Sequence, residues 1–162
     1  MFTCFEPYFT ELEGKTWGII GLGNIGRKVA QIASVFGCRV IFYSASGNNN
    51  TTEYERVDFD TLLAQSDIIS LHCPLTDRTQ NIMNAEAFAK MKKTAILINV
   101  ARGPVVDEQA LYDALTTGEI AAAGLDVLNK EPIAADNPLA QIKDSTKLFI
   151  TPHMAWGSNE AR

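Results

Sequence analysis

Short apolar runs rich in β-branched residues alternate with stretches of helical periodicity along most of the chain. These runs cover residues 17–20, 40–43, 68–71, 95–98, 121–125 and 148–150. Their continuous apolar character is typical of strands buried on both faces of a parallel sheet. Because the two patterns alternate with short connections, they indicate right-handed βαβ units. The pattern predicts a single α/β domain built on a doubly wound parallel sheet.

The helical patterns carry their own start and stop signals. The first has one apolar stripe, as in a helix that packs on a sheet, made by Ile25, Val29, Ile32, Ala33 and Phe36. Asn84 and Asp107 are predicted N-caps of two later helices, and Gly118 follows the second as a stop signal. A short helix through residues 62–63 is predicted to start at Asp58 or Asp60.

The composition narrows the class of protein. Of the 162 residues, 46% are apolar and 20% are charged, as in a soluble globular domain. The net charge is −5 and no Lys/Arg cluster is present, which argues against a nucleic acid or an anionic membrane as partner. No apolar run approaches the roughly 20 residues needed to span a bilayer.

Cysteine and histidine usage indicates a reducing compartment and no metal site. Cys4, Cys38 and Cys73 are odd in number and widely spaced, which excludes a disulfide framework or a CxxC site. His72 and His153 show no ligand spacing either. The N-terminal MFTCFEPYF has no basic leader and is not expected to be a signal peptide. The predicted location is therefore the cytoplasm.

The segment GLGNIG, residues 21–26, directly follows an apolar run and opens a helical pattern. In that context Gly21 permits a tight turn, Gly23 lets a pyrophosphate approach the backbone, and Gly26 lets helix and strand pack closely. The free amide groups at the helix N-terminus then attract phosphates. A purely structural glycine turn is the alternative, but the context favours dinucleotide binding.

Ligands of such folds bind beyond the carboxyl ends of the strands, so the residues there are informative. Cys73 and Pro74 follow residues 68–71 and could form an apolar wall beside an adenosine, unless Pro74 only ends the strand. Arg102 is either an ordinary surface arginine or a planar clamp for a carboxylate. Asp126 could accept hydrogen bonds from a nicotinamide carboxamide.

Three ionisable residues beyond different predicted strands suit hydride transfer to a carbonyl. His153 would donate the proton, because histidine titrates near neutral pH. Glu131, hydrogen-bonded to the other ring nitrogen, would favour the imidazolium form. Arg102 would hold the substrate carboxylate and polarise its carbonyl. A lone histidine is usually structural or on the surface, but the three residues together indicate an active site.

The segments ELEGKTWGIIGLGNIG, MKKTAILINVARGPVVDEQAL, GEIAAAGLDVLNKEP and TPHMAW resemble the D-isomer-specific 2-hydroxyacid dehydrogenases. This family includes hydroxypyruvate reductases and phosphoglycerate dehydrogenases, and the resemblance extends from about residue 11 to residue 156. It implies a Rossmann-type dinucleotide-binding fold, Arg102, Glu131 and His153 as catalytic residues, and a homodimer joined through this domain. It also implies NAD contacts at Asn24, Ile25, Ser44, Cys73, Pro74, Thr79, Val100, Ala101, Asp126 and the backbone around His153.

The sequence departs from the family pattern in its length. Family members carry a second, smaller domain built from both chain ends, and the active site is the cleft between the two domains. Only sixteen residues precede Trp17 here, and nine follow His153. Residues 1–162 are therefore expected to be an NAD-binding domain alone, with a core at about 11–156, and to be poorly active in isolation.

A second departure is Ser44, which stands where an acid usually binds the adenosine ribose and repels a 2′-phosphate. Serine can hydrogen-bond a hydroxyl but supplies no charge. The segment YSASGNNNTTEYE, residues 43–55, contains no Arg or Lys to attract a 2′-phosphate. We therefore expect NAD as the cofactor, with a modest rather than strict preference over NADP.

The predicted function is hydride transfer between NAD(H) and a small D-2-hydroxy acid or 2-oxo acid of the hydroxypyruvate, glyoxylate or phosphoglycerate type. Two alternatives of the same fold carry no chemistry: a dinucleotide-dependent corepressor and a nucleotide-sensing module. The compact, acidic chain without interaction tails argues against the corepressor. Turnover of a 2-oxo acid would separate the enzyme from both alternatives.

Overall fold

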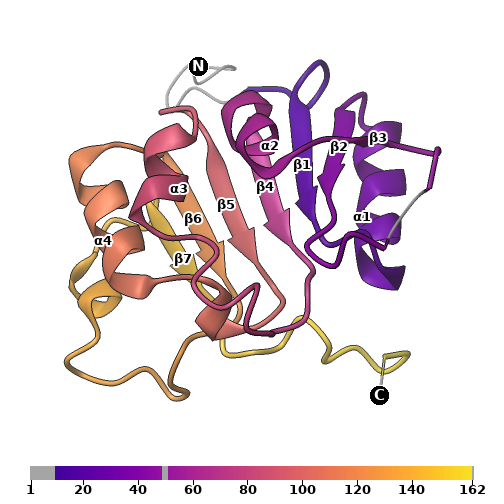
Figure 1. The fold of residues 1–162 in the computed structure, drawn as a ribbon. Helices are drawn as coiled ribbons and strands as arrows, with labels where there is room; N and C mark the ends of the chain where they lie inside the picture. Colours follow the sequence, from indigo (N-terminus) through magenta and orange to yellow (C-terminus); the bar gives the residue numbers. More distant parts are fainter. Residues whose placement is uncertain (1–9, 49–50, 162) are drawn as a thin grey trace, which may run out of the picture.

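The structure is a computed structural model that describes residues 10–48 and 51–161. The predictions made for Cys4 and for the N-terminal MFTCFEPYF concern residues 1–9, which lie outside the described residues. Every element of the fold belongs to one sheet or to the helices and loops that connect its strands (Figure 1).

Seven strands form the sheet in the order β3-β2-β1-β4-β5-β6-β7, and every neighbouring pair is parallel. The strand order reverses between β1 and β4, which is the topology of a doubly wound sheet. The predicted fold class is therefore confirmed. The strands are β1 Thr16–Ile20, β2 Arg39–Tyr43, β3 Glu55–Arg56, β4 Ile68–Leu71, β5 Ile96–Asn99, β6 Ala122–Leu125 and β7 Leu148–Ile150.

The helices are α1 Asn24–Val35, α2 Phe59–Gln65, α3 Ala85–Lys90 and α4 Glu108–Thr117, with short 3-10 helices η1 Gly103–Val105 and η2 Pro138–Gln141. The predicted caps at Asn84 and Asp107 are confirmed, because each side chain accepts a hydrogen bond from a backbone amide of the first turn. Between the two candidates for α2, Asp58 is the cap. Gly118 ends α4 in the left-handed conformation, with φ of 77°.

The strand β3 was not predicted. Its two residues, Glu55 and Arg56, are both charged and exposed, and they pair with Ile41 and Phe42 of β2. A strand of two polar residues at the edge of a sheet has no apolar pattern by which sequence could reveal it.

The helix α1 turns only part of the predicted stripe to the sheet, since Ala33 is buried and Val29 packs against buried apolar residues. Ile25, Ile32 and Phe36 are 67%, 57% and 58% exposed, whereas Gly26 and Ala30 are buried. A β-carbon at position 26 would meet the carbonyl oxygen of Gly21 at 2.3 Å, so α1 and β1 approach too closely for large side chains. Small residues therefore face the strand, and Ile25, Ile32 and Phe36 of the predicted stripe point outward.

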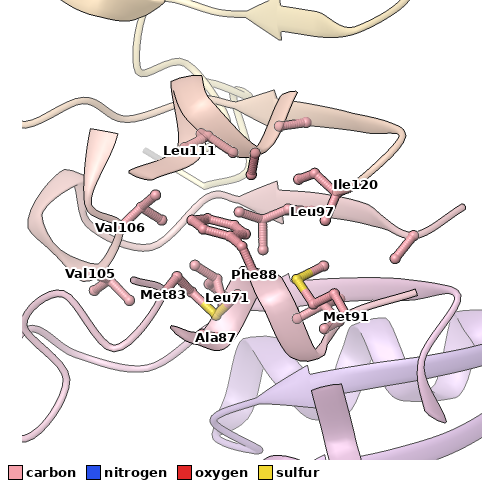
Figure 2. Packing of buried hydrophobic residues seen from close by; sticks show 14 of the residues in the cluster. Leu71, Met83, Ala87, Phe88, Met91, Leu97, Val105, Val106, Leu111 and Ile120 are labelled. Atoms are coloured by element: carbon pink, nitrogen blue, oxygen red, sulfur yellow. The ribbon is translucent and has the colours of Figure 1, made fainter. Parts of the chain in front are cut away.

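Two apolar clusters bury the two faces of the first half of the sheet. Successive side chains of β1 and β2 point to opposite faces of the sheet. Ile20 and Ile41 belong to the cluster under α2, α3 and α4, and Ile19 and Phe42 belong to the cluster under α1. Phe88 of α3 lies at the centre of the larger cluster and is fully buried (Figure 2).

The second half of the sheet is buried on one face only, so the expectation of strands buried on both faces is wrong for β5, β6 and β7. Leu97, Ala123 and Leu148 face the large cluster. Residues of the opposite face are open: Ile96 is 39% exposed and Phe149 is 64% exposed. Within the described residues, no helix packs over this part of the sheet closely enough to bury those side chains.

Candidate functional site

Two hollows open at the carboxyl ends of the strands. The first, of about 270 Å³, lies where β1, β2 and β4 end, at the point where the strand order reverses. That switch point is where ligands of doubly wound sheets bind. Its lining consists of Gly21, Leu22, Gly23, Ser44, Ala45, Ser46, His72, Cys73, Pro74, Thr76 and Thr79.

The three glycines of GLGNIG have different environments. Gly21 has φ of +95°, and a β-carbon there would meet the backbone nitrogen of Cys73 at 2.7 Å. Gly26 is required by the close approach of α1 to β1. A β-carbon on Gly23 would meet no atom within 4 Å, so no contact within the described residues requires glycine at this position. The open space beside Gly23 belongs to the hollow.

The other walls of the first hollow come from the ends of β2 and β4. Ser44 directly follows β2 and is only 6% exposed, and its hydroxyl lies 3.5 Å from that of Ser46. Cys73 is buried, and burial raises the pKa of its thiol to about 11, so it acts as an apolar surface. The Thr79 hydroxyl donates to the Pro74 carbonyl at 2.6 Å and accepts from the Thr76 amide at 2.8 Å, which fixes the loop that carries Pro74.

His72, the next residue after β4, also lines the first hollow. Burial lowers the pKa of its imidazole to about 4, so the ring is neutral at physiological pH. Its Nε2 lies 3.0 Å from the Ser70 hydroxyl, which accepts a hydrogen bond from the Trp17 indole at 2.9 Å. These contacts make His72 part of the strand packing.

At the N-terminus of α1, Asn24 and Ile25 occupy the first two helical positions. Both residues are exposed, and they directly follow Gly23, which lines the first hollow. After β5, Val100 and Ala101 form a turn that is held by the Asn99 side chain. Its Oδ1 accepts from the Ala101 amide and its Nδ2 donates to the Arg102 carbonyl, each at 3.0 Å. Sequence reasoning missed Asn99, although a buried polar residue that ends an apolar run is a usable signal.

The second hollow, of about 530 Å³, lies beyond the ends of β6 and β7. Apolar side chains make up much of its wall, and three ionisable residues, Asp126, Glu131 and His153, line it. The residues around it are Asp126, Leu128, Glu131, Pro132, Ile133, Ile150, Thr151, Pro152 and His153.

The structure brings Glu131 and His153 into contact, although 22 positions separate them in sequence. His153 Nδ1 lies 2.8 Å from one carboxylate oxygen of Glu131, and the other oxygen accepts from the Leu128 amide at 3.0 Å. The hydrogen bond from the Leu128 amide lowers the pKa of the Glu131 carboxyl most, and the hydrogen bond with His153 lowers it further, so Glu131 is ionised. His153 has φ of 51°, an uncommon conformation that concentrates at functional sites.

Asp126 holds the segment that carries His153. One carboxylate oxygen accepts from the Thr151 hydroxyl at 2.5 Å and from the Met154 amide at 2.8 Å, and the other accepts from the Ala155 amide at 2.8 Å. Burial alone would raise the pKa of this carboxyl, but the three donors outweigh burial and lower it. Both oxygens are thus engaged within the protein.

Arg102 projects from the turn after β5 and is exposed, and its Nη1 donates to the Ala101 carbonyl at 2.6 Å. It does not line the second hollow, so its contact with Glu131 or His153 is not part of this structure. At Gly103, the next residue, the Arg102 turn contacts the loop that carries Glu131. A β-carbon on Gly103 would lie 2.0 Å from the Leu128 carbonyl oxygen, so the segment around Glu131 packs directly on the Arg102 turn.

Glu108, which sequence reasoning also missed, supports the loop that carries Glu131. Glu108, in the first turn of α4, accepts from the Asn129 amide at 2.7 Å and from the Asn137 side chain at 2.8 Å. It therefore anchors both ends of the segment that presents Glu131. No sequence signal distinguishes it from the acid that commonly occupies a first helical turn.

Two further findings concern the described part of the chain only. No group of three or more His, Cys, Asp or Glu side chains is arranged there to hold a metal ion. Among the helices there, none combines the length and the apolar character that crossing a bilayer requires.

Known proteins resemble the chain over nearly its whole length. A hydroxypyruvate reductase of Blautia hydrogenotrophica is 48% identical, over 98% of this chain and 49% of its own. A structure described as a D-lactate dehydrogenase with NAD⁺ from Lactobacillus jensenii is 42% identical, with a TM-score of 0.85 over 94% of this chain and 49% of its own. An acyclic imino acid reductase in complex with NADPH and D-Arg is 39% identical, with a TM-score of 0.89 over 100% of this chain and 51% of its own.

The chain thus spans about half the length of the curated relatives that it matches. The family model for the NAD binding domain of D-isomer specific 2-hydroxyacid dehydrogenases matches residues 5–155. That match includes the glycine turn, the Arg102 turn and the Glu131–His153 pair. The chain belongs to the family of D-isomer specific 2-hydroxyacid dehydrogenase NAD-binding domains.

Proposed function

We propose that this chain is the NAD-binding domain of an oxidoreductase that transfers hydride between NAD(H) and a small D-2-hydroxy acid or 2-oxo acid. The observation that carries the proposal is the 2.8 Å contact between Glu131 and His153. The pair lies at the same edge of the sheet as the hollow beside Gly23. A proton-transfer pair and a dinucleotide cradle at one edge are what reduction of a carbonyl requires.

The residues of the first hollow suit a dinucleotide. Gly23 leaves the backbone free to approach a pyrophosphate, the amides of Asn24 and Ile25 point from the first turn of α1, and Ser44 offers a hydroxyl to the adenosine ribose. Cys73 and Pro74 supply the apolar wall beside the adenine. When bound, the nicotinamide supplies or accepts the hydride. Thr79, Val100, Ala101 and Asp126 complete the proposed set, with the backbone around His153.

Glu131 and His153 of the second hollow, together with Arg102 outside it, then handle the proton and the substrate. His153 donates a proton to the substrate oxygen during reduction and removes it during oxidation. Ionised Glu131 fixes the ring through Nδ1, which leaves Nε2 for the substrate, and it stabilises the imidazolium. Arg102 binds the substrate carboxylate through its planar guanidinium, once it releases the Ala101 carbonyl.

The whole protein's substrate is proposed to be a small 2-oxo acid of the hydroxypyruvate, glyoxylate or phosphoglycerate type, in keeping with the name of the reductase cited above. We further propose that additional protein surface completes the site, supplied by a second domain and by a second copy in a homodimer. The open face of β5–β7 and the exposed apolar residues of α1 support this, because apolar surface of that kind favours coverage. The buried free thiols Cys38 and Cys73 fit a cytoplasmic location.

Steady-state oxidation of NADH with glyoxylate and hydroxypyruvate tests the proposal, on the full polypeptide that carries this sequence. His153→Ala should lower the maximal rate by roughly a hundredfold or more, with dinucleotide affinity nearly unchanged. Glu119→Gln, at an exposed position just beyond the end of α4, is the control and should retain the full rate. Equal rates in the wild type and His153→Ala would refute the proposed role, and saturable NADH binding without turnover of any 2-oxo acid would favour a nucleotide sensor.

A further inference from the structure

The fold brings a cation to the segment that follows Ser44. Arg27 lies in α1, immediately after the last glycine of GLGNIG. Its Nη1 donates to Glu53 at 3.1 Å and lies 3.4 Å from the Thr51 hydroxyl. Both acceptors belong to the connection between β2 and β3, which begins at Ser44. Residues 43–55 contain no Arg or Lys of their own, so α1 supplies the positive charge that this connection lacks.

The start of the same connection offers neutral groups. Ser44 and Ser46 line the first hollow together with Gly21 and Gly23, and neither carries a charge. In dinucleotide-binding folds the residue at the end of the second strand meets the adenosine ribose. An acid at that place repels a 2′-phosphate, whereas a nearby arginine accommodates one. Ser44 removes the repulsion. Arg27 does not line the hollow itself, but it contacts the connection that begins at Ser44 and is therefore the candidate arginine.

The contact between Arg27 and Glu53 is of a kind that a phosphate can replace. The two side chains are 38% and 45% exposed, and an ion pair so open to water stabilises a protein little. A phosphate offers the planar guanidinium a doubly charged acceptor with several oxygens, which arginine binds bidentately. Glu53 has the opposite effect, because its carboxylate neutralises Arg27 and repels an approaching phosphate.

We propose that Arg27 and Glu53 form a cofactor-selecting pair, in which Arg27 binds the 2′-phosphate of NADP and Glu53 opposes that binding. The chain then accepts both dinucleotides, and the charge balance of this pair sets their ratio. The inference rests on the proposed function, since it requires a dinucleotide in the first hollow.

Calorimetric titration of NAD and NADP into four variants tests the pair. Arg27→Gln should weaken NADP roughly tenfold, equivalent to about 1.4 kcal/mol, and leave NAD within about twofold. Glu53→Gln should tighten NADP severalfold and leave NAD unchanged. Arg39→Gln and Glu55→Gln are matched controls, because these residues form a similar exposed pair at 2.7 Å with Arg39 at the opposite end of β2. Neither control should change the ratio of the two affinities.

Other outcomes would overturn the proposed role of Arg27 and Glu53. Arg27→Gln that leaves NADP unchanged, or that weakens both dinucleotides equally, overturns the selecting role and leaves the proposed function intact. If the wild type binds NAD but not NADP, Glu53→Gln must create NADP binding, and its failure to do so also overturns the pair. A wild type that binds neither dinucleotide refutes the proposed function, and the inference with it.

Discussion

Asp126→Asn should destabilise the fold because the carboxylate holds the His153 segment through three donors. Asparagine keeps one acceptor oxygen for Thr151 and Met154, but its NH₂ group replaces the oxygen that accepts from the Ala155 amide. A hydrogen bond to a charged group contributes about 1.5–3 kcal/mol, and a neutral one about 0.5–1.5 kcal/mol. One bond to a charged acceptor is lost and two become neutral. Since Ala155 is exposed and water can replace part of the loss, we expect the free energy of unfolding to fall by about 2–4 kcal/mol.

Urea denaturation followed by far-UV circular dichroism at pH 7 measures this change, with Asp136→Asn on an exposed loop as control. The difference should also depend on pH. The folded-state pKa of Asp126 is lowered from its usual value of 3.8, so the stabilisation is complete above that value. It is lost as the pH falls through the lower folded-state pKa. Asp126→Asn within about 0.5 kcal/mol of the wild type and of the control at pH 7 would refute the reasoning.

Two further substitutions test the loop around Glu131. Gly103→Ala should destabilise the chain by about 1–3 kcal/mol, because its β-carbon would lie 2.0 Å from the Leu128 carbonyl oxygen. Gly124→Ala is the control, because a β-carbon there meets none of the described residues within 4 Å. Equal melting curves for the two variants would contradict the close packing of Gly103 on Leu128. Glu131→Gln should lower the maximal rate of 2-oxo acid reduction by roughly tenfold or more, because the charged carboxylate that fixes the His153 ring through Nδ1 is gone. A maximal rate equal to that of the wild type would make Glu131 a structural residue only.

Much of the fold could be predicted from the sequence, because long-range order in a parallel sheet follows from local signals. Apolar runs located six of the seven strands, and the caps at Asn84 and Asp107 fixed two helix starts. Side-chain size misled the reading of α1. Periodicity weighs Ile25 and Ile32 most heavily, yet the close approach to β1 selects Gly26, Ala30 and Ala33, of which only Ala33 belongs to the predicted stripe.

Part of the candidate site could likewise be predicted from the sequence, and part could not. Residues at strand ends could be predicted, since the carboxyl edge of a parallel sheet gathers them, and Glu131 and His153 do meet there. The supporting residues Glu108 and Arg27 could not be predicted, because each contacts a loop distant in the sequence and only the folded chain shows which loop it meets. Asn99 is different, because it contacts residues two and three positions along the chain and its place at the end of an apolar run is a usable signal.

Direct binding of NADH tests the central claim, that the hollow beside Gly23 is a dinucleotide site. Titration followed by NADH fluorescence should give saturable binding to the wild-type chain. Gly23→Val should abolish it, because the side chain occupies the space left for the pyrophosphate. Among the described residues, none beyond the chain neighbours of Gly23 lies within 4 Å of the β-carbon, so the fold should tolerate the change and the urea midpoint should shift little. Equal NADH affinity in the wild type and a folded Gly23→Val variant would contradict the account.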